Sequence, residues 1–390
     1  KNLNIKSKLI TQKKISNIDF DQIILSPGID WNKCRLSKFL KKNYYKIFTD
    51  LDVFYSFYKN DCITITGTNG KSTTCQLMYK VLLNQKIDAR LVGNIGNPIL
   101  SVKNIKKKTI FVVEASSYQL EYSKIFRSKY AAILNLSHDH IERHKTLNKY
   151  IQSKFSLLLN QIKGQIAFVK KDDLLIKKFI KSNSFNSKII KINTKETEYF
   201  LKDIENKYFS SETNKENLSF VIEIAKKLKL KKNLLIKTIK NFNGLKYRQE
   251  IILRRKNLTI INDSKSTSFS STAPLLESYK NIYWILGGLA KKGDKLIIKK
   301  KYIQNVRAYI YGKDKNFFID SLPNQISYKS SSTLKKIMKN LINNIKNDNT
   351  KKVILFSPCA ASFDQFKNFE ERGKFFNNII RVMLKKLKHE

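Results

Sequence analysis

The feature that most constrains the fold is a short apolar run that meets a glycine-bracketed turn, Ile63-Thr64-Ile65-Thr66-Gly67-Thr68-Asn69-Gly70-Lys71-Ser72-Thr73-Thr74. The β-branched run predicts a buried strand, and the segment from Cys75 to Asn84 predicts a helix. Such a turn offers backbone N–H groups and a helix N-terminus to an anion, with a lysine for phosphate and a hydroxyl for Mg²⁺. The unit therefore predicts an α/β fold that binds a nucleoside triphosphate.

The spacing of this turn is unusual. The common phosphate loop has four residues between its glycines, whereas only Thr68 and Asn69 separate Gly67 from Gly70. A pattern this short can arise by chance in a lysine-rich chain, and the alternative is an ordinary surface turn. The strand before it and the helix after it favour the phosphate site.

Length and composition limit the class of protein. A chain of 390 residues is expected to form two or three domains. It has no apolar stretch of about 18 residues, so no membrane span or membrane partner is expected. The polar, basic segment from Lys1 to Lys14 does not resemble a signal peptide. Four cysteines without paired spacing argue against a zinc site and a disulfide framework, and fit a reducing cytoplasm.

The net charge of +45 would ordinarily indicate a nucleic-acid partner. The lysines, however, are spread along the whole chain and accompany abundant Asn and Ile, while Ala, Gly and Pro are few. This distribution favours a chain-wide compositional bias over a dedicated surface. No nucleic-acid partner is expected, and a nucleic-acid-stimulated P-loop ATPase remains the alternative.

Three blocks are expected. Residues 1–56 hold one strand, Gln22–Leu25, before the turn Ser26-Pro27-Gly28; because this block is small and begins with Lys, we expect an incomplete N-terminal domain. Residues 57–243 alternate helices with strands, which predicts a parallel sheet covered on both faces. Residues 244–390 repeat the alternation. The expected strands are Cys62–Thr66, Thr109–Glu114, Ala131–Leu136, Ile166–Val169, Thr259–Asn262, Ile282–Leu286, Ala308–Tyr311 and Lys352–Phe356.

Polar residues follow several of these strands, where ligands of open α/β sheets bind. Glu114 ends an apolar strand one βα unit after the phosphate loop, so it could hold Mg²⁺; the alternative is a solvated glutamate. His138, His140 and His144 follow the next strand. Their spacing lacks the partners of a zinc site, which favours a second Mg²⁺ ligand over zinc, with chance clustering as the alternative. Lys154, in the expected helix Asn148–Gln161, is by spacing alone one lysine among many.

The C-terminal block shows the same pattern at three strand ends. Asp263 and Lys265 follow the first strand and could meet a ribose, a water, a phosphate or a carboxylate. A glycine turn after the second leads to Lys291, and the last strand leads into the run from Ser357 to Arg372. Together they predict an anionic small-molecule substrate.

These motifs, from Ser26-Pro27-Gly28-Ile29 to Gly373, resemble those of the Mur ligases, the ATP-dependent amino-acid-adding enzymes of peptidoglycan precursor synthesis. The short phosphate loop is similar to the family's own. The segments Gly93–Gly96, Glu114–Gln119 and Asp139–His144 stand where the family has theirs. The run Ser357–Gly373 is similar to the branch that adds D-glutamate.

The resemblance implies three domains: a short N-terminal α/β domain, a central P-loop-type parallel sheet and a Rossmann-like C-terminal domain, in a monomer. Lys71, Ser72 and Thr73 would hold the triphosphate, and Glu114 with Ser72 the first Mg²⁺. His140 and Lys154 would serve a second Mg²⁺, and Lys154 matches the lysine that the family carbamylates with CO₂. With Lys265, the resemblance implies a catalytic set of Lys71, Glu114, His140, Lys154 and Lys265.

The remaining contacts follow in the same way. The muramoyl substrate would meet Asn94, Ser116 and Gln119, and ATP would meet the phosphate loop with Asn217, Arg248 and Asp263. D-Glutamate would meet Lys265, Thr267, Lys291, Ser362 and Phe369. The chain departs from the family at Thr213-Asn214, where His-Asn is usual, and at Tyr247-Arg248, where His-Arg is usual. It also lacks the family's glycine-containing strand–turn for the UDP group.

The implied activity is ATP-dependent addition of D-glutamate to UDP-N-acetylmuramoyl-L-alanine through an acyl phosphate and a tetrahedral intermediate. The alternatives are another Mur or folylpolyglutamate-type ligase, the nucleic-acid-associated ATPase, and a catalytically silent ligase.

Overall fold

The computed structural model describes residues 10, 12–15, 17–201, 204–291, 293–345 and 350–386. The chain divides into two compact units, 1–197 with 219–235, and 198–218 with 236–390. Three helices run through the sequence positions where the division falls: α9 (Lys195–Leu201), α10 (Glu212–Lys227) and α11 (Lys232–Lys240). The boundaries expected at 56/57 and 243/244 remain predictions.

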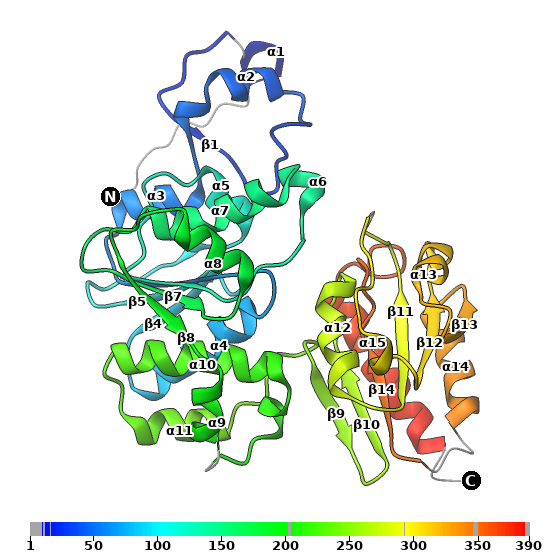
Figure 1. Ribbon diagram of the computed structural model, residues 1–390. Helices are drawn as coiled ribbons and strands as arrows, with labels where there is room; N and C mark the ends of the chain where they lie inside the picture. Colours follow the sequence, from blue (N-terminus) through cyan, green and yellow to red (C-terminus); the bar gives the residue numbers. More distant parts are fainter. Residues whose placement is uncertain are drawn as a thin grey trace. The chain divides into compact units, whose positions relative to one another are not determined.

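A six-stranded parallel sheet forms the centre of the first unit, which confirms the α/β class (Figure 1). Its strands lie in the order β4 (Ala89–Gly93), β5 (Ile110–Glu114), β3 (Cys62–Thr66), β6 (Tyr130–Ile133), β7 (Ile166–Lys170) and β8 (Lys188–Ile192). Because the strands are parallel, their carboxyl ends meet at one edge. Ile65 pairs with Glu114 and Thr66 with Ile133, so the phosphate loop begins between the ends of β5 and β6.

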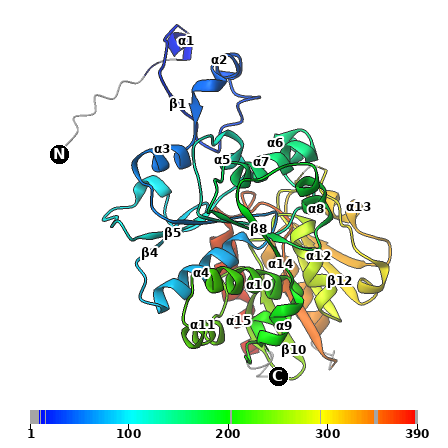
Figure 2. The same ribbon diagram turned by 60° about the vertical axis from the view of Figure 1, so that its left-hand side comes forward.

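Helices cover both faces of this sheet, as expected. α4 (Lys71–Asn84) lies on one face, and α5 (Ser117–Tyr122) and α7 (Leu147–Leu159) lie on the other (Figure 2). On the α7 face, strand residues Phe111 and Ile133 belong to one buried cluster with Tyr150 and Phe155. The unit also contains α3 (Asp50–Phe57), α6 (Ile141–His144) and α8 (Leu174–Lys181).

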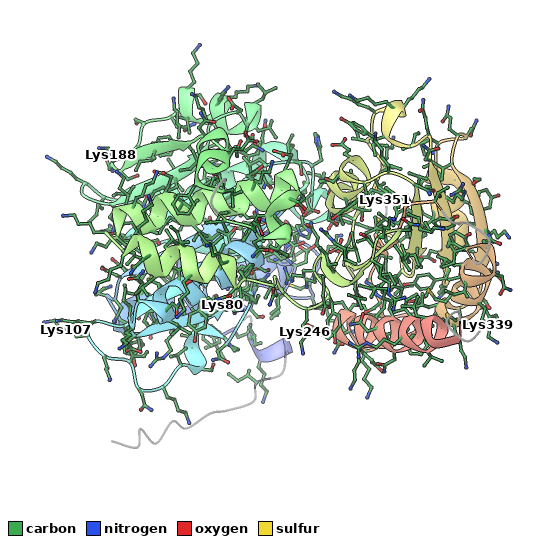
Figure 3. The ribbon with its side chains drawn as sticks, turned by 90° about the horizontal axis from the view of Figure 1, so that it is seen from below. Lys80, Lys107, Lys188, Lys246, Lys339 and Lys351 are labelled. Atoms are coloured by element: carbon green, nitrogen blue, oxygen red, sulfur yellow. The ribbon has the colours of Figure 1, made fainter. Side chains whose placement is uncertain are left out.

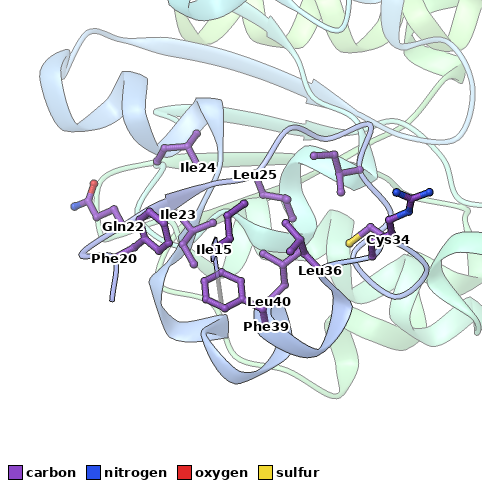
Figure 4. Close-up of a pocket in the computed structure, with 12 residues that line it drawn as sticks. Ile15, Phe20, Gln22, Ile23, Ile24, Leu25, Cys34, Leu36, Phe39 and Leu40 are labelled. Atoms are coloured by element: carbon purple, nitrogen blue, oxygen red, sulfur yellow. The ribbon is translucent and has the colours of Figure 1, made fainter. Parts of the chain in front are cut away.

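The N-terminal part of the first unit is small. Two short strands, β1 (Ile23–Ile24) and β2 (Ile47–Phe48), pair in parallel beside α1 (Gln12–Ile15) and α2 (Ser37–Lys42). Between them an open, mostly apolar pocket of ≈ 490 Å³ is lined by Phe20, Leu36 and Phe39 among others (Figure 4).

The second unit holds a mixed sheet in the order β13 (Ser327–Ser331), β12 (Val306–Tyr311), β11 (Ile282–Gly287), β14 (Lys352–Phe356), β10 (Leu258–Asn262) and β9 (Glu250–Arg254). Only β9 runs antiparallel to its neighbour among the paired strands described. α12 (Phe269–Ser278) and α13 (Lys315–Ser321) share one buried cluster, and α14 (Leu334–Ile345) and α15 (Phe369–Lys386) share another.

The expected strands all occur: Cys62–Thr66 and Lys352–Phe356 have the expected bounds, and the others have at least one end shifted by one to three residues. Five of the strands formed by the described residues were not expected: β2, β4, β8, β9 and β13. β8 and β13 are edge strands that expose one face to solvent, so β8 contains lysines and β13 consists mostly of exposed residues. Neither shows the alternation of apolar and polar residues that predicts a strand. The helix expected from Cys75 begins at Lys71, since Gly70 in the left-handed region starts it earlier.

Candidate active site

The phosphate loop leaves the carboxyl end of β3, whose five residues are all buried. Gly67 (φ +152°) and Gly70 (φ +84°) both adopt conformations that favour glycine. A Cβ at Gly67 would lie 3.1 Å from the Leu134 Cβ, so the loop passes close to the end of β6. Gly70 caps α4, which places Lys71, Ser72 and Thr73 in the first turn of a 14-residue helix. This is the strand–turn–helix that an anion site needs.

Two lysine amines meet at this loop. The Lys71 Nζ donates to the carbonyl oxygens of Gly67 (2.8 Å) and Thr68 (2.9 Å). The Lys154 Nζ, carried by α7, donates to the same Gly67 oxygen at 2.9 Å and to Thr66 Oγ1 at 3.4 Å. Lys154 is buried. Burial, and then the nearby Lys71 charge, hold the pKa of Lys154 well below its usual range, while Asp139 and Glu114 oppose this shift.

Side chains from two other elements fix the loop in place. Thr68 Oγ1 lies 2.9 Å from the Tyr150 hydroxyl and accepts from the Ser137 N–H at 3.0 Å. Asn135, just after β6, accepts from the Asn69 N–H with its Oδ1 (2.9 Å) and donates to the Asn69 oxygen with its Nδ2 (3.3 Å). The loop is therefore held in shape before any nucleotide binds.

Glu114 lies at the end of β5 beside this loop. Its carboxylate is buried; Oε1 accepts from the Asn94 Nδ2 at 2.7 Å, and Oε2 has no hydrogen-bond partner within the described parts of the chain. Asn94 also donates its backbone N–H to the Glu114 backbone oxygen at 2.9 Å. A buried, oriented carboxylate oxygen without a partner is the kind of donor that Mg²⁺ takes.

The segment that contains His138, His140 and His144 forms the short helix α6 and the turn before it. His140, in the left-handed region (φ +54°), shares a hydrogen bond with the Tyr118 hydroxyl through Nδ1 (2.7 Å), and its Nε2 lies 3.3 Å from Asp139 Oδ2. His144 is buried against the Ser117 hydroxyl (2.9 Å). Burial and the neighbouring His140 lower the pKa of His144 to about 4, so it is neutral. His138 is exposed.

Ser116 and Gln119 make the reciprocal cap that begins α5. Gln119 donates its backbone N–H to Ser116 Oγ (3.2 Å), and its Oε1 accepts from the Ser116 backbone N–H (3.1 Å). Gln119 Nε2 also donates to Asp50 Oδ2 at 3.0 Å. Both side chains therefore have structural roles besides the substrate contact that the sequence predicts.

The second unit carries the other predicted site residues. Asp263 follows β10 and is buried; it accepts from the Ser357 hydroxyl (2.8 Å) and the Gln249 N–H (3.1 Å). Burial raises the pKa of Asp263 to about 7, and these hydrogen bonds and the charges of Arg248 and Arg372 oppose the rise. Arg248 and Asp263, both predicted ATP contacts, are thus neighbours.

The predicted D-glutamate residues lie at three strand ends and on α15. The Lys265 Nζ lies 4.1 Å from the centre of the Phe369 ring, a cation–π contact. Thr267 is exposed and Ser362 is buried, and Lys291 follows β11. Asn217, on α10, is buried, and its Oδ1 has no hydrogen-bond partner among the described residues.

Sequence reasoning assigned no role to Tyr150 or Asn135, although both hold the loop. Two signals were available. Asn135 follows β6 at the sheet edge where ligands bind, and Tyr150 lies four residues before Lys154, which places both on one face of α7. The Lys154 Nζ lies 4.8 Å from the Tyr150 ring centre.

The donor set bears on the metal ions. In the described ranges no cluster of three or more His, Cys, Asp or Glu side chains is suited to a metal ion, and none of the four cysteines forms a disulfide. Zinc therefore finds no ligand set there. Ser72 and the unpartnered Glu114 oxygen fit a Mg²⁺ held mainly by phosphate oxygens and water, which is how that ion usually binds.

The chain was compared with known proteins. The model of the Mur ligase middle domain matches residues 65–237. A UDP-N-acetylmuramoylalanine–D-glutamate ligase of Rickettsia bellii is 32% identical over 97% of this chain and 88% of its own length. The enzyme of that name from Francisella tularensis subsp. novicida is 35% identical over 94% of this chain and 87% of its length.

Solved structures agree in fold. The MurF ligase from Thermotoga maritima in complex with ADP gives a TM-score of 0.62 at 13% identity, covering 96% of this chain and 97% of that one. The UDP-N-acetylmuramate–alanine ligase MurC of the same organism gives 0.57 at 15% identity, covering 93% and 85%. Because curated relatives at 32% and 35% identity match over 94% or more of its length, this chain belongs to the Mur ligase family.

Proposed function

We propose that this protein adds D-glutamate to UDP-N-acetylmuramoyl-L-alanine at the expense of ATP, in peptidoglycan precursor synthesis. The observation that carries the proposal is the meeting of Lys71, buried Lys154 and Glu114 at a preformed phosphate loop. The choice of acceptor and amino acid rests on the names of the curated relatives and on the run Ser357–Gly373.

The chemistry follows from the charges. A carboxylate is a poor electrophile, so the alanyl carboxylate takes the γ-phosphoryl group from ATP, giving an acyl phosphate and ADP. Lys71 and the N–H groups of the loop bind the phosphate oxygens and stabilise the charge that gathers on them. In the structure the Lys71 amine donates to two loop carbonyls, which it would exchange for phosphate oxygens.

The second step forms the amide. The D-glutamate amine attacks the acyl carbon, and the tetrahedral intermediate expels inorganic phosphate and loses a proton. Lys265 and Lys291 supply cations for the two carboxylates of D-glutamate, with Thr267, Ser362 and Phe369 beside them. Asn217, Arg248 and Asp263 would contact the nucleotide, and Asn94, Ser116 and Gln119 the muramoyl substrate.

The metal sites are part of the proposal. When bound, Mg²⁺ neutralises charge on the transferring phosphoryl group. Ser72 and Glu114 would hold one ion, and His140 and Lys154 the other. An ammonium cannot ligate a metal, but the lowered pKa of Lys154 favours its neutral amine, and a neutral amine adds CO₂ to give a carbamate and a proton. The oxygens of that carbamate would then serve as ligands of the second Mg²⁺, beside His140.

Location and assembly are also proposals. No helix in the described ranges is long and apolar enough to cross a membrane. A cytoplasmic monomer acting on small molecules fits the composition and the cysteines, none of which forms a disulfide.

The test is phosphate release from ATP and Mg²⁺ with UDP-N-acetylmuramoyl-L-alanine and, in separate reactions, D-glutamate, L-glutamate, L-alanine or a diamino acid. We expect release that needs both the nucleotide sugar and D-glutamate. Release with a different amino acid would assign another ligase, and no release with any of them would overturn the proposal. Lys71→Ala is the negative control, because it removes the phosphate-binding amine.

A further inference from the structure

Arg372 is a fully buried arginine in the first turn of α15. Two features make this position costly. The N-terminus of a helix repels a cation, and a buried charge must be compensated by hydrogen bonds and neighbouring opposite charges. The contacts that Arg372 makes show what its side chain holds together.

The guanidinium joins two loops that follow different strands. Its Nε donates to Ser264 Oγ (3.1 Å) and its Nη2 to the Ser264 backbone oxygen (2.6 Å), after β10. The same Nη2 donates to the Ala360 oxygen at 3.0 Å, after β14. Ser264 directly precedes Lys265, and Ala360 lies two residues before Ser362, so each loop carries a residue proposed to bind D-glutamate.

A third loop, after β11, lies against the same group. A Cβ at Gly288 would be 3.4 Å from the Arg372 Nη1 and only 2.5 Å from the Ala361 oxygen. Leu289 and Ala361 exchange two backbone hydrogen bonds of 3.0 Å. This loop leads directly to Lys291.

The start of α15 is held in the same way. The Ser264 hydroxyl that accepts from Arg372 donates to the Phe369 oxygen at 2.9 Å. Asn262 donates through Nδ2 to the Gly373 oxygen, also at 2.9 Å. The guanidinium therefore joins the loops after β10 and β14 directly, and the loop after β11 and the start of α15 are bonded in turn to these two loops. These four segments carry the proposed D-glutamate residues Lys265, Thr267, Lys291, Ser362 and Phe369.

We propose that Arg372 is a positioning residue for the amino-acid substrate: it fixes the spacing of the cationic and polar groups that select D-glutamate. The inference rests on the proposed function. Arg372 is buried and acts through these loops rather than by touching the substrate. The planar fork of arginine reaches two loops at fixed angles, which the single ammonium of lysine cannot do.

The test is steady-state kinetics of Arg372→Lys with each substrate varied in turn. The variant keeps the charge and loses the fork, so we expect KM for D-glutamate to rise by about tenfold or more. KM for UDP-N-acetylmuramoyl-L-alanine should stay within about twofold, since its proposed contacts Asn94, Ser116 and Gln119 all belong to the other unit.

A second variant covers the case in which Arg372→Lys does not fold. Ser264→Ala removes the hydroxyl that links Arg372 to Phe369, and we expect KM for D-glutamate to rise by about threefold or more. Tyr309→Phe is the matched control: it removes a buried hydroxyl bonded to Asn344 (2.7 Å) in the same sheet, and it should leave every KM unchanged.

The outcomes separate the two claims. A wild-type protein that releases no phosphate with D-glutamate overturns the proposed function, and this inference with it. An active wild type whose Arg372→Lys and Ser264→Ala variants keep the original KM for D-glutamate overturns the inference alone. The same holds if KM rises equally for all three substrates, because that pattern describes general loss of structure.

Discussion

At the scale of single residues, the candidate site contains groups whose pKa burial has shifted. Lys154 and Asp263 were both predicted from the sequence as site residues, but nothing in the sequence indicated their protonation. Burial favours the neutral form of each, the amine of Lys154 and the acid of Asp263. Perturbed pKa values of this kind gather at functional sites.

We predict that Lys154 reacts with CO₂. The neutral amine is the nucleophile, so labelling with ¹³C-bicarbonate should give one carbamate carbon signal by NMR in the wild type and none in Lys154→Ala. Phosphate release should fall by about 100-fold in that variant, because the charged carbamate at the phosphoryl site is lost. Lys149→Ala, on the exposed face of the same helix, should keep both the signal and the rate. A signal retained in Lys154→Ala would refute the assignment.

We predict a pH-dependent contribution of Asp263 to stability. An acid whose pKa is raised by folding binds its proton more tightly when folded, so its contribution is complete below the unfolded pKa of about 3.8 and is lost as the pH rises through about 7. The free energy of unfolding of wild type relative to Asp263→Asn should therefore fall across that window, by about 1.4 kcal/mol for every tenfold by which folding tightens proton binding.

Urea unfolding in a Trp31→Phe background measures this, because buried Trp284 then reports on the second unit alone. Asp320→Asn, at an exposed position of α13, serves as the control. A difference that stays flat from pH 4 to pH 7 would show that Asp263 titrates as an ordinary aspartate.

At the scale of elements, strand ends and the turns after them determine the geometry of the site. Gly93 ends β4 with φ +99°, and a Cβ there would lie 2.4 Å from the backbone oxygen of Glu114. The backbone at the end of β4 therefore packs closely against the end of β5, which carries the Glu114 carboxylate proposed to hold Mg²⁺.

We predict that Gly93→Ala is more damaging than Gly164→Ala. Both positions have positive φ, but a Cβ at Gly164 would have nothing within 4 Å. In both variants backbone strain should lower the free energy of unfolding by about 1 kcal/mol. In Gly93→Ala it should fall by about 1–3 kcal/mol more, because Glu114 must shift. Thermal unfolding gives the stabilities, and phosphate release should fall only in Gly93→Ala. Equal losses in the two variants would mean that the contact with Glu114 does not matter.

At the scale of the whole molecule, the charge of +45 is distributed over both units. Figure 3 shows exposed lysines on each, Lys80, Lys107 and Lys188 on the first and Lys246, Lys339 and Lys351 on the second. Solvated lysines at this density attract any polyanion at low salt without forming a specific site.

We predict that duplex DNA binds weakly and without function. Binding measured by fluorescence anisotropy at about 50 mM salt should be lost by about 200 mM, because counterion release drives it. The rate of phosphate release, with both ligase substrates or with neither, should not change when DNA is added. ATP hydrolysis that requires DNA and no amino acid would favour the nucleic-acid-associated ATPase instead.

Much of the local structure could be predicted from the sequence. β-Branched runs located eight of the twelve strands of the two six-stranded sheets to within a few residues, and the glycine turn before Lys71 located the phosphate loop. Strand pattern and turn chemistry are local properties. The edge strands β8 and β13 could not be predicted, since pairing with a neighbour, and not their own apolar pattern, makes them strands.

The chemistry of the site was decided by tertiary structure. The Lys154 amine meets the loop 87 residues earlier in the chain, and Arg372 meets Ser264 from 108 residues away. Such meetings depend on the order of strands in a sheet and on which helix face packs against it. Burial then altered the pKa values, an effect that no spacing along the chain encodes. The sequence by itself predicted a phosphate loop in an α/β fold, because strand pattern and turn chemistry are local. Only the folded chain determined which lysine has a lowered pKa and which arginine joins the loops after β10 and β14.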